Sequence, residues 1–264
     1  MKLGFIGTGN MASAIMGGII KNQIIPANEI IGADVMEAGR KRVKEQFGIQ
    51  VTADNHEVVR NSDVVILSVK PQFYAEVIAE IKDDVREDQI IITIAPGKTL
   101  AWLKEQFGKN VKIVRTMPNT PALVGEGMTA ACPNEYMTKE EIAYVLTLLE
   151  SFGRVEIIPE RLMDTVVSVS GSSPAYVFMF IEAMADAAVS QGMPRKQAYK
   201  FASQTVLGSA KMVLETGKHP GELKDMVCSP AGTTIEAVRV LEEKGFRSAV
   251  IEAMKTCEEI SKNM

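Results

Sequence analysis

The feature that most constrains this chain is a glycine-rich turn at its start. A short apolar run, Leu3–Ile6, is followed by Gly7, Gly9 and Ala12 in the spacing G-x-G-x-x-A, and a helical pattern begins there. The first glycine permits a tight turn, the second lets a ligand approach the backbone, and the small third residue keeps the helix close to the sheet. Backbone N–H groups at the start of such a helix bind phosphate. A plain strand-to-helix turn also favours glycine, so the motif acquires meaning only from its surroundings.

Those surroundings are typical of a dinucleotide-binding unit. A second predicted strand within Glu29–Asp34 ends in an acid, at the position that usually holds the adenosine ribose. A carboxylate there accepts hydrogen bonds from both ribose hydroxyls and repels a 2′-phosphate, which favours NADH over NADPH. Arg40, Lys41 and Arg42 follow, and they either offset that repulsion or form a solvated helix face. We therefore expect NADH or NADPH as the cofactor, with NADH favoured.

Short runs rich in β-branched residues alternate with helical patterns through the first half of the chain. This alternation predicts an α/β fold: a Rossmann-like doubly wound parallel sheet with helices on both faces. The predicted strands are Leu3–Ile6, Ile30–Ala33, Val64–Leu67, Ile90–Ile94, Ile113–Arg115 and Val155–Ile158, and the predicted helices are Met11–Ile20, Ala38–Phe47, Phe73–Ile81, Leu100–Phe107 and Thr138–Ser151.

The second half shows only helical spacing after about Met163. Within it, Ala175–Val189 is apolar nearly all round, with Glu182 and Asp186 as interruptions, and we read it as too short to cross a membrane. An all-round apolar helix predicts the centre of a core or a subunit interface. We divide the chain into a dinucleotide-binding domain, 1–160, and an all-helical C-terminal domain, 161–264. The predicted helices are Ser172–Ser190, Arg195–Glu215, Gly221–Val227, Thr234–Glu243 and Phe246–Ser261.

Charge and cysteine usage exclude several classes of function. A net charge of -4 and a pI near 5.5 give no electrostatic reason to expect nucleic acid or a membrane surface as a partner. The three cysteines lie far apart with no C-x-x-C spacing, and the two histidines stand in different contexts, so we expect neither disulfides nor a metal site. We recognise no signal peptide, and we expect a cytoplasmic location.

Four further segments carry chemistry-bearing residues. Two follow predicted strands at the edge where doubly wound sheets bind ligands, and we expect them to reach the cofactor: Ser68, Val69, Lys70 and Pro71, then Ala95 and Gly97. Lys70 is equally interpretable as an ordinary loop cation. In the helical half, Val169–Tyr176 is predicted as a small-residue turn and Leu223–Ala237 as a hydroxyl-rich loop that opens a helix. Their simplest role is helix capping, by Ser172 and Thr233.

Taken together, these segments resemble the pyrroline-5-carboxylate reductases. The resemblance runs from Met1 to about Ser261 and rests on GFIGTGNMA, SVKP, RTMPNTPALVGEG, SGSSPAY and LKDMVCSPAGTTIEAVRVLE. The last stretch is the specific family signature, whereas the glycine motif is shared with many dehydrogenases. The resemblance implies an enzyme that transfers a hydride from NAD(P)H to the imine carbon of 1-pyrroline-5-carboxylate and forms L-proline.

The resemblance also implies site residues and an assembly. Substrate binding falls on the signature loop, where Thr234 lies near the ring nitrogen and is the catalytic candidate. Members of the family are homodimers, commonly assembled into rings of dimers, with the helical domain as the dimer interface. The implied substrate contacts are Ser229, Gly232, Thr233 and Thr234, and the implied cofactor contacts are Ile6, Gly7, Thr8, Gly9, Asn10, Met11, Asp34, Asn55, Ser68, Val69, Lys70 and Pro71.

Two other functions compete with this one. A β-hydroxyacid dehydrogenase shares the glycine-rich turn and a helical second domain, but it would place a catalytic lysine in that domain. Lysines are available there, at Lys196, Lys200, Lys211 and Lys218, yet none stands in a matching small-residue motif. A non-catalytic dinucleotide sensor is the second alternative, against which the hydroxyl-rich signature loop argues.

Overall fold

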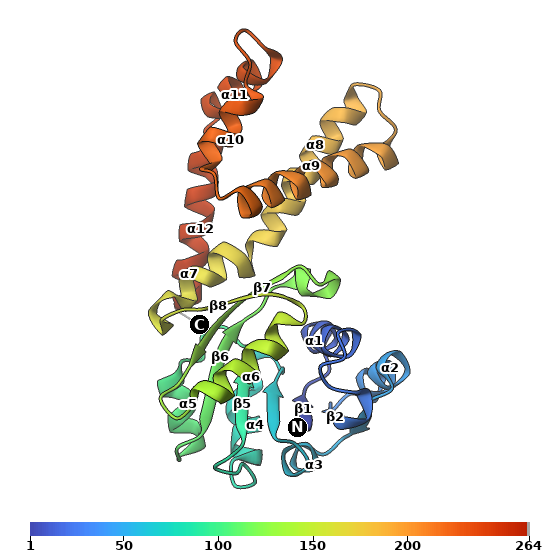
Figure 1. The fold of residues 1–264 in the computed structure, drawn as a ribbon, viewed down its shortest axis with the longest axis vertical. Helices are drawn as coiled ribbons and strands as arrows, with labels where there is room; N and C mark the ends of the chain where they lie inside the picture. Colours follow the sequence, from blue (N-terminus) through green and yellow to red (C-terminus); the bar gives the residue numbers. More distant parts are fainter. Residues whose placement is uncertain (263–264) are drawn as a thin grey trace. The chain divides into compact units, whose positions relative to one another are not determined.

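The computed structural model describes residues 1–262, which form two compact units. The first unit contains Met1–Ser172 and the chain from Cys257 onward, and the second contains Ser173–Thr256. An eight-stranded sheet in the order β3-β2-β1-β4-β5-β6-β7-β8 is the centre of the first unit (Figure 1). The strands are β1 Leu3–Ile6, β2 Ile30–Ala33, β3 Gln50–Thr52, β4 Val64–Leu67, β5 Ile90–Thr93, β6 Lys112–Met117, β7 Gly127–Pro133 and β8 Gly153–Ile157.

The predicted strands are all present, but the sheet differs from the prediction in two ways. Strands β3 and β7 were not predicted, because β3 has three residues and β7 is built of small residues with few β-branched ones. Strand β7 pairs antiparallel with β6, whereas every other pairing is parallel. The sheet is therefore mostly parallel and not wholly so.

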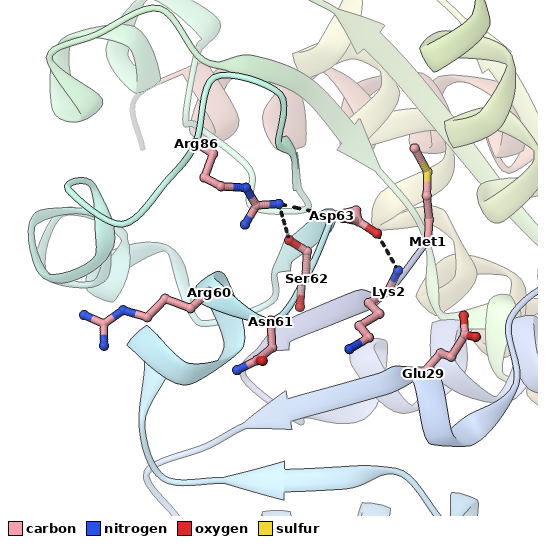
Figure 2. Close-up of a pocket in the computed structure, with 8 residues that line it drawn as sticks. All are labelled: Met1, Lys2, Glu29, Arg60, Asn61, Ser62, Asp63 and Arg86. Carbon is pink, nitrogen blue, oxygen red and sulfur yellow. Dashed lines mark hydrogen bonds and ion pairs between the residues drawn. The ribbon is translucent and has the colours of Figure 1, made fainter.

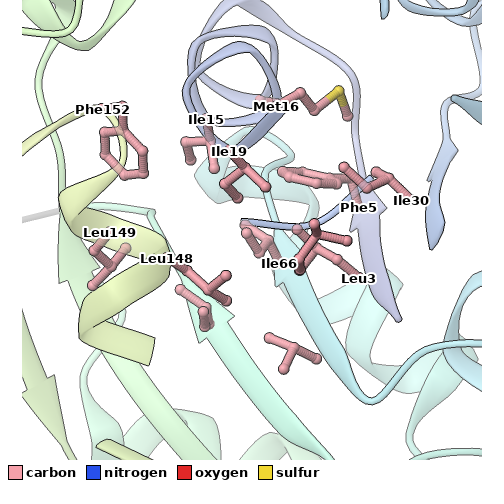
Figure 3. Packing of buried hydrophobic residues seen from close by; sticks show 14 of the residues in the cluster. Leu3, Phe5, Ile15, Met16, Ile19, Ile30, Ile66, Leu148, Leu149 and Phe152 are labelled. Carbon is pink, nitrogen blue, oxygen red and sulfur yellow. The ribbon is translucent and has the colours of Figure 1, made fainter. Parts of the chain in front are cut away.

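Helices cover both faces of this sheet, as expected for strands that are buried on both sides. On one face, Leu3 and Phe5 of β1 pack with Ile15 and Ile19 of α1 and with Leu148 of α6 (Figure 3). The opposite face packs β-strand residues against α3, α4 and α5. The helices of this unit are α1 Asn10–Lys21, α2 Glu37–Phe47, α3 Asn55–Arg60, α4 Tyr74–Ile81, α5 Leu100–Phe107, α6 Lys139–Glu150 and α7 Met163–Val166, with shorter turns at η1 Ala27–Glu29, η2 Pro71–Phe73, η3 Thr120–Val124 and η4 Glu160–Leu162.

Local sequence signals set several of these boundaries. Helix α6 begins after Thr138, which caps it in a reciprocal arrangement: the Thr138 side chain accepts from the Glu141 N–H, and the Glu141 side chain accepts from the Thr138 N–H. Helices α2 and α5 are followed by the C-cap residues Gly48 and Gly108, both with a left-handed backbone that favours glycine. Pro71 opens η2, as expected for a first helical residue.

The second unit consists of helices with almost no interior of their own. Helices α8 and α9 pack side by side (Figure 1). Phe180 of α8 contacts Phe246 at the start of α12, with ring centroids 6.0 Å apart. Of this unit's residues, only Ala185, Ala198 and Ala202 are buried. The helices are α8 Ser173–Ser190, α9 Arg195–Thr216, α10 Pro220–Val227, α11 Thr233–Glu243 and α12 Phe246–Lys262, the end of which belongs to the first unit.

The predicted burial of Ala175–Val189 in a core is wrong for the single chain. Phe178 and Met179 are 62% and 67% exposed, and Val177 and Phe180 are also exposed. Exposed apolar surface of this kind is typical of an interface, which is the other role that the sequence allowed.

The expected small-residue turn before α8 is also not a turn. Residues Val167–Gly171 form a π-helical segment, η5, and the helical path continues from η4 through α7 and η5 into α8. The resulting stretch, Glu160–Ser190, has 31 residues and contains an 18-residue window with a mean hydropathy of 1.2, so length and composition alone would allow it to cross a membrane. The sequence-based argument that the run is too short therefore fails. A single such helix is weak evidence for a membrane span.

Candidate active site

The glycine-rich turn has the backbone geometry that its motif predicts. Gly7 has φ +93°, and a Cβ there would lie 2.7 Å from the Ser68 carbonyl oxygen, so only glycine fits. Gly9 is different, because a Cβ there would meet no atom within 4 Å. Gly9 is also the N-cap of α1 and provides no side-chain cap, while Ala12 is fully buried against the sheet. The turn therefore leaves open space beside uncapped N–H groups, which fits a bound phosphate.

Asp34 lies at the end of β2 and is bonded to this turn. Its Oδ2 accepts hydrogen bonds from the backbone N–H and the hydroxyl of Thr8, both at 2.8 Å, and its Oδ1 accepts from the Met36 N–H at 2.9 Å. A carboxylate offers about four lone-pair sites, so one remains for a ribose hydroxyl. Asp34 thus fixes the turn and keeps one acceptor site where the motif predicts the ribose.

Two of the three basic residues after Asp34 are not a solvated helix face. Arg40 donates to the Asp34 and Val35 carbonyls, and Arg42 donates to the Thr8 carbonyl. Only Lys41 behaves as a surface charge, 3.9 Å from Glu45. Helix α2 approaches closely because residue 39 is glycine: a Cβ there would lie 2.9 Å from the Thr8 hydroxyl and 3.3 Å from the Asp34 carboxyl group.

The two other predicted cofactor loops lie at the same edge, after β4 and β5. Ser68 is turned toward the glycine-rich turn, with its hydroxyl 2.6 Å from the Gly7 carbonyl oxygen. Tyr74 ties the loops together: its buried hydroxyl donates to the Leu67 carbonyl and accepts from the Ile94 N–H, and burial raises its pKa. Val69 is half-buried, Lys70 is exposed, Ala95 is buried, and Gly97 has φ +72°.

Asn55 begins α3 beside a cluster of charged groups. Its side-chain amide donates to Glu80 at 2.9 Å, and the neighbouring His56 is hydrogen-bonded through Nδ1 to Asp84. That hydrogen bond raises the pKa of His56 and, together with Arg60, lowers the pKa of Asp84. Asp54, His56 and Glu80 are grouped closely enough to hold a metal ion, but both carboxylates are exposed, so ion pairing with His56 accounts for the arrangement. His219 caps α10 through Nδ1 and is not part of this cluster.

The signature loop presents a second helix N-terminus without a side-chain cap. The predicted cap, Thr233, is instead the first residue of α11, and Gly232 is the N-cap with no side-chain hydrogen bond. The preceding turn is tight: the Gly232 N–H donates to the Ser229 carbonyl at 3.0 Å, and Ala231 has φ +57°, which is unusual outside glycine. Ser229 and Thr233 are exposed, and Thr234 is half-buried. The loop therefore offers hydroxyls and free N–H groups to an anion.

The RTMPNTPALVGEG stretch has a supporting role that sequence reasoning missed. The side-chain amide of Asn119 donates to the Ser170 carbonyl at 3.0 Å, and its Oδ1 accepts from the Met128 N–H at 2.9 Å. Asn119 thereby satisfies a carbonyl of the π-helical segment η5. Arg115 on β6, which is buried, pairs with Glu160 at 2.9 Å. Neither role leaves a local signal, because both partners are far away in sequence.

An open hollow of about 620 Å³ lies at the opposite edge of the sheet, before β1 and β4 begin (Figure 2). Two of its charged side chains are already engaged within the protein: Asp63 accepts from the Lys2 backbone N–H at 2.8 Å and lies 3.7 Å from Arg86, which also donates to the Ser62 carbonyl at 3.1 Å. Ligands of doubly wound sheets bind at the carboxyl ends of the strands, so this hollow is not the candidate site.

Comparisons with known proteins agree with this geometry. The family model "Pyrroline-5-carboxylate reductase dimerisation" matches residues 160–264, and "NADP oxidoreductase coenzyme F420-dependent" matches residues 2–97. The chain is 54% identical to the pyrroline-5-carboxylate reductase of Escherichia coli, with 100% of this chain and 98% of the relative covered. The chain belongs to the pyrroline-5-carboxylate reductase family. This membership replaces the β-hydroxyacid dehydrogenase alternative.

Solved structures of pyrroline-5-carboxylate reductases share the fold over the whole chain. The enzyme from Coxiella burnetii is 36% identical with a TM-score of 0.91, covering 99% of this chain and 97% of the other. The Plasmodium falciparum enzyme, solved with NADP bound, is 33% identical with a TM-score of 0.91, covering 100% and 97%. This reductase therefore has an NAD(P)H-binding α/β domain and a helical dimerisation domain.

Proposed function

We propose that this chain reduces 1-pyrroline-5-carboxylate to L-proline through the residues described above. The observation that carries the proposal is the uncapped start of α11, where Gly232 gives no side-chain oxygen to the helix N–H groups. A substrate carboxylate is an anion of the size and charge that such a helix end binds. NAD(P)H, when bound, supplies the hydride that the imine carbon accepts.

On the cofactor side, the glycine-rich turn holds the pyrophosphate. The Gly7 N–H donates to Ala33 and the Thr8 N–H to Asp34, so the phosphate contacts fall to the backbone from Gly9 onward. Asp34 accepts a ribose hydroxyl and favours NADH over NADPH. The remaining proposed contacts are Ile6, Asn10, Met11, Asn55, Ser68, Val69, Lys70, Pro71, Ala95 and Gly97.

On the substrate side, the signature loop binds the carboxylate and orients the ring. The N–H groups of Gly232, Thr233 and Thr234 and the hydroxyl of Ser229 hold the carboxylate. The Thr234 hydroxyl then lies near the ring nitrogen. A protonated imine is already a strong electrophile, so orientation of the two reacting rings supplies most of the catalysis. An ordinary hydroxyl is a poor acid, and Thr234 therefore positions the nitrogen more than it donates a proton.

The chain-level organisation follows from the same proposal. We assign cofactor binding to residues 1–160 and substrate binding with dimerisation to residues 161–264. The homodimer assembles further into a ring of dimers, and the enzyme works in the cytoplasm.

The test is to supply purified protein with 1-pyrroline-5-carboxylate and to follow the oxidation of NADH and NADPH in parallel, with proline measured as the product. We expect turnover with both cofactors and a higher kcat/KM for NADH. A higher kcat/KM for NADPH would refute the role given to Asp34 and leave the reaction intact. Binding of both cofactors without oxidation would refute the reaction and favour a dinucleotide sensor.

A further inference from the structure

We propose that Arg40 and Arg42 form a subsite for the 2′-phosphate of NADPH beside Asp34. The inference rests on the proposed cofactor site and extends it: one ribose pocket serves both cofactors, with Asp34 bonding a ribose hydroxyl of NADH and the two arginines bonding the phosphate of NADPH.

The two guanidinium groups lie at the carbonyls that surround the ribose position. Arg40 donates to the carbonyls of Asp34 and Val35, the second at 3.2 Å, and Arg42 donates to the carbonyl of Thr8. These carbonyls belong to the end of β2 and to the glycine-rich turn, the two segments that meet through the Asp34 carboxylate. Both arginines reach this point from α2.

The same contacts prepare the arginines to bind an anion. A guanidinium group has five N–H donors, so each arginine keeps free donors after bonding these carbonyls. Arg42 is exposed and Arg40 is half-buried, so both remain accessible at the surface. Because backbone carbonyls already hold the side chains, less conformational freedom is lost when a phosphate binds.

The charge of Asp34 does not prevent this. Three protein hydrogen bonds, from Thr8 N–H, Thr8 hydroxyl and Met36 N–H, stabilise the carboxylate within its own loop. Gly39 keeps α2 close enough for the arginines to reach across, because a Cβ there would lie 3.3 Å from the Asp34 carboxyl group. A phosphate at this point therefore meets two positive charges and one hydrogen-bonded negative charge.

Lys41 supplies a matched control. It stands between the two arginines in sequence and carries the same charge, but its side chain is 73% exposed and lies 3.9 Å from Glu45. A diffuse electrostatic effect would involve all three basic residues, whereas a subsite involves only Arg40 and Arg42.

The experiment measures the binding of 2′,5′-ADP and 5′-AMP to the full chain by titration calorimetry. The variants are Arg40→Gln and Arg42→Gln, which replace the guanidinium group by an uncharged amide, with Lys41→Gln as the control. We expect each arginine variant to weaken 2′,5′-ADP about tenfold and 5′-AMP less than about twofold, since bonds from charged donors to phosphate are the strong ones. Lys41→Gln leaves both affinities unchanged.

Equal weakening of both probes by the arginine variants would overturn the proposal and leave them a purely structural role. An effect of Lys41→Gln as large as theirs would also overturn it. Should Arg42→Gln not fold, Arg40→Gln and Arg42→Lys allow the same comparison. Because the probes report binding without turnover, a protein that binds them as expected but does not reduce 1-pyrroline-5-carboxylate would refute the proposed function and support the subsite.

Discussion

Replacing Gly9 by alanine separates cofactor binding from folding. A Cβ at this position meets no protein atom within 4 Å, and the backbone φ of −68° suits alanine. We expect the free energy of unfolding to fall by less than about 1 kcal/mol, because alanine is a poorer N-cap than glycine. The same methyl group occupies the space where the backbone approaches the pyrophosphate. An overpacking cost of about 1–3 kcal/mol corresponds to cofactor binding weakened about 5- to 150-fold.

Gly7→Ala is the matched control, because we expect it to lower the stability of the fold more than Gly9→Ala does. The left-handed backbone costs about 1–2 kcal/mol, and a Cβ 2.7 Å from the Ser68 carbonyl oxygen adds the overpacking cost of about 1–3 kcal/mol. At about 2–4 °C per kcal/mol, the Tm falls several degrees or more. Calorimetry gives the Tm, and titration with NADPH gives the Kd. A Gly9→Ala protein that binds NADPH like the wild type would refute the assignment of this turn to the pyrophosphate.

Three further predictions test the rest of the molecule. Thr234→Ala lowers kcat about fivefold to tenfold, because one hydrogen bond to the substrate is lost. Thr234→Ser retains activity, and the Kd of the cofactor is unchanged in both variants. Unaltered steady-state kinetics in the alanine variant would remove Thr234 from the site. Phe178→Glu weakens dimerisation about 30-fold or more in analytical ultracentrifugation, whereas Lys41→Glu does not; a dimer of normal affinity would contradict the interface. His56 has a raised pKa, so its stabilisation is full below its unfolded value of 6.5 and is lost as the pH rises through the folded value. The free energy of unfolding therefore decreases over that range, and His56→Gln abolishes the decrease; an identical pH profile in both proteins would show that the pair with Asp84 contributes nothing.

The architecture could be predicted where local patterns and tertiary packing agree. Strands β1 and β4 are continuous apolar runs, and the glycine-rich turn predicts the helix that follows it. Strand β7 was not predicted because its sequence, GMTAACP, has small residues in place of a β-branched run. Hydrogen bonding to β6 stabilises the strand although its residues have low β-propensity. The segment η5 was predicted as a turn because its residues are small. In the structure it is π-helical, and Asn119, which is distant in sequence, bonds its Ser170 carbonyl.

The site was predictable in its residue types but not in its contacts. The sequence motif identifies Gly7, Gly9 and Asp34, because their spacing alone carries the meaning. It does not tell which way Arg40 and Arg42 point, because a run of basic residues on an exposed helix has no local preference between solvent and a neighbouring carbonyl. Only the close approach of α2 at Gly39, a tertiary feature, decides that.

The shortage of interior in the helical unit has a consequence for the enzyme in a cell. Three buried alanines cannot supply the apolar burial that a helical domain needs, so we expect the folding of this half to depend on association with a second chain. A newly made chain therefore has an N-terminal half with a hydrophobic core of its own and a helical half that lacks one until a second chain binds. Because pairing is second order in chain concentration, the amount of working reductase rises more steeply than the amount of chain at low expression. Chains that wait longest are the most exposed to proteolysis and aggregation.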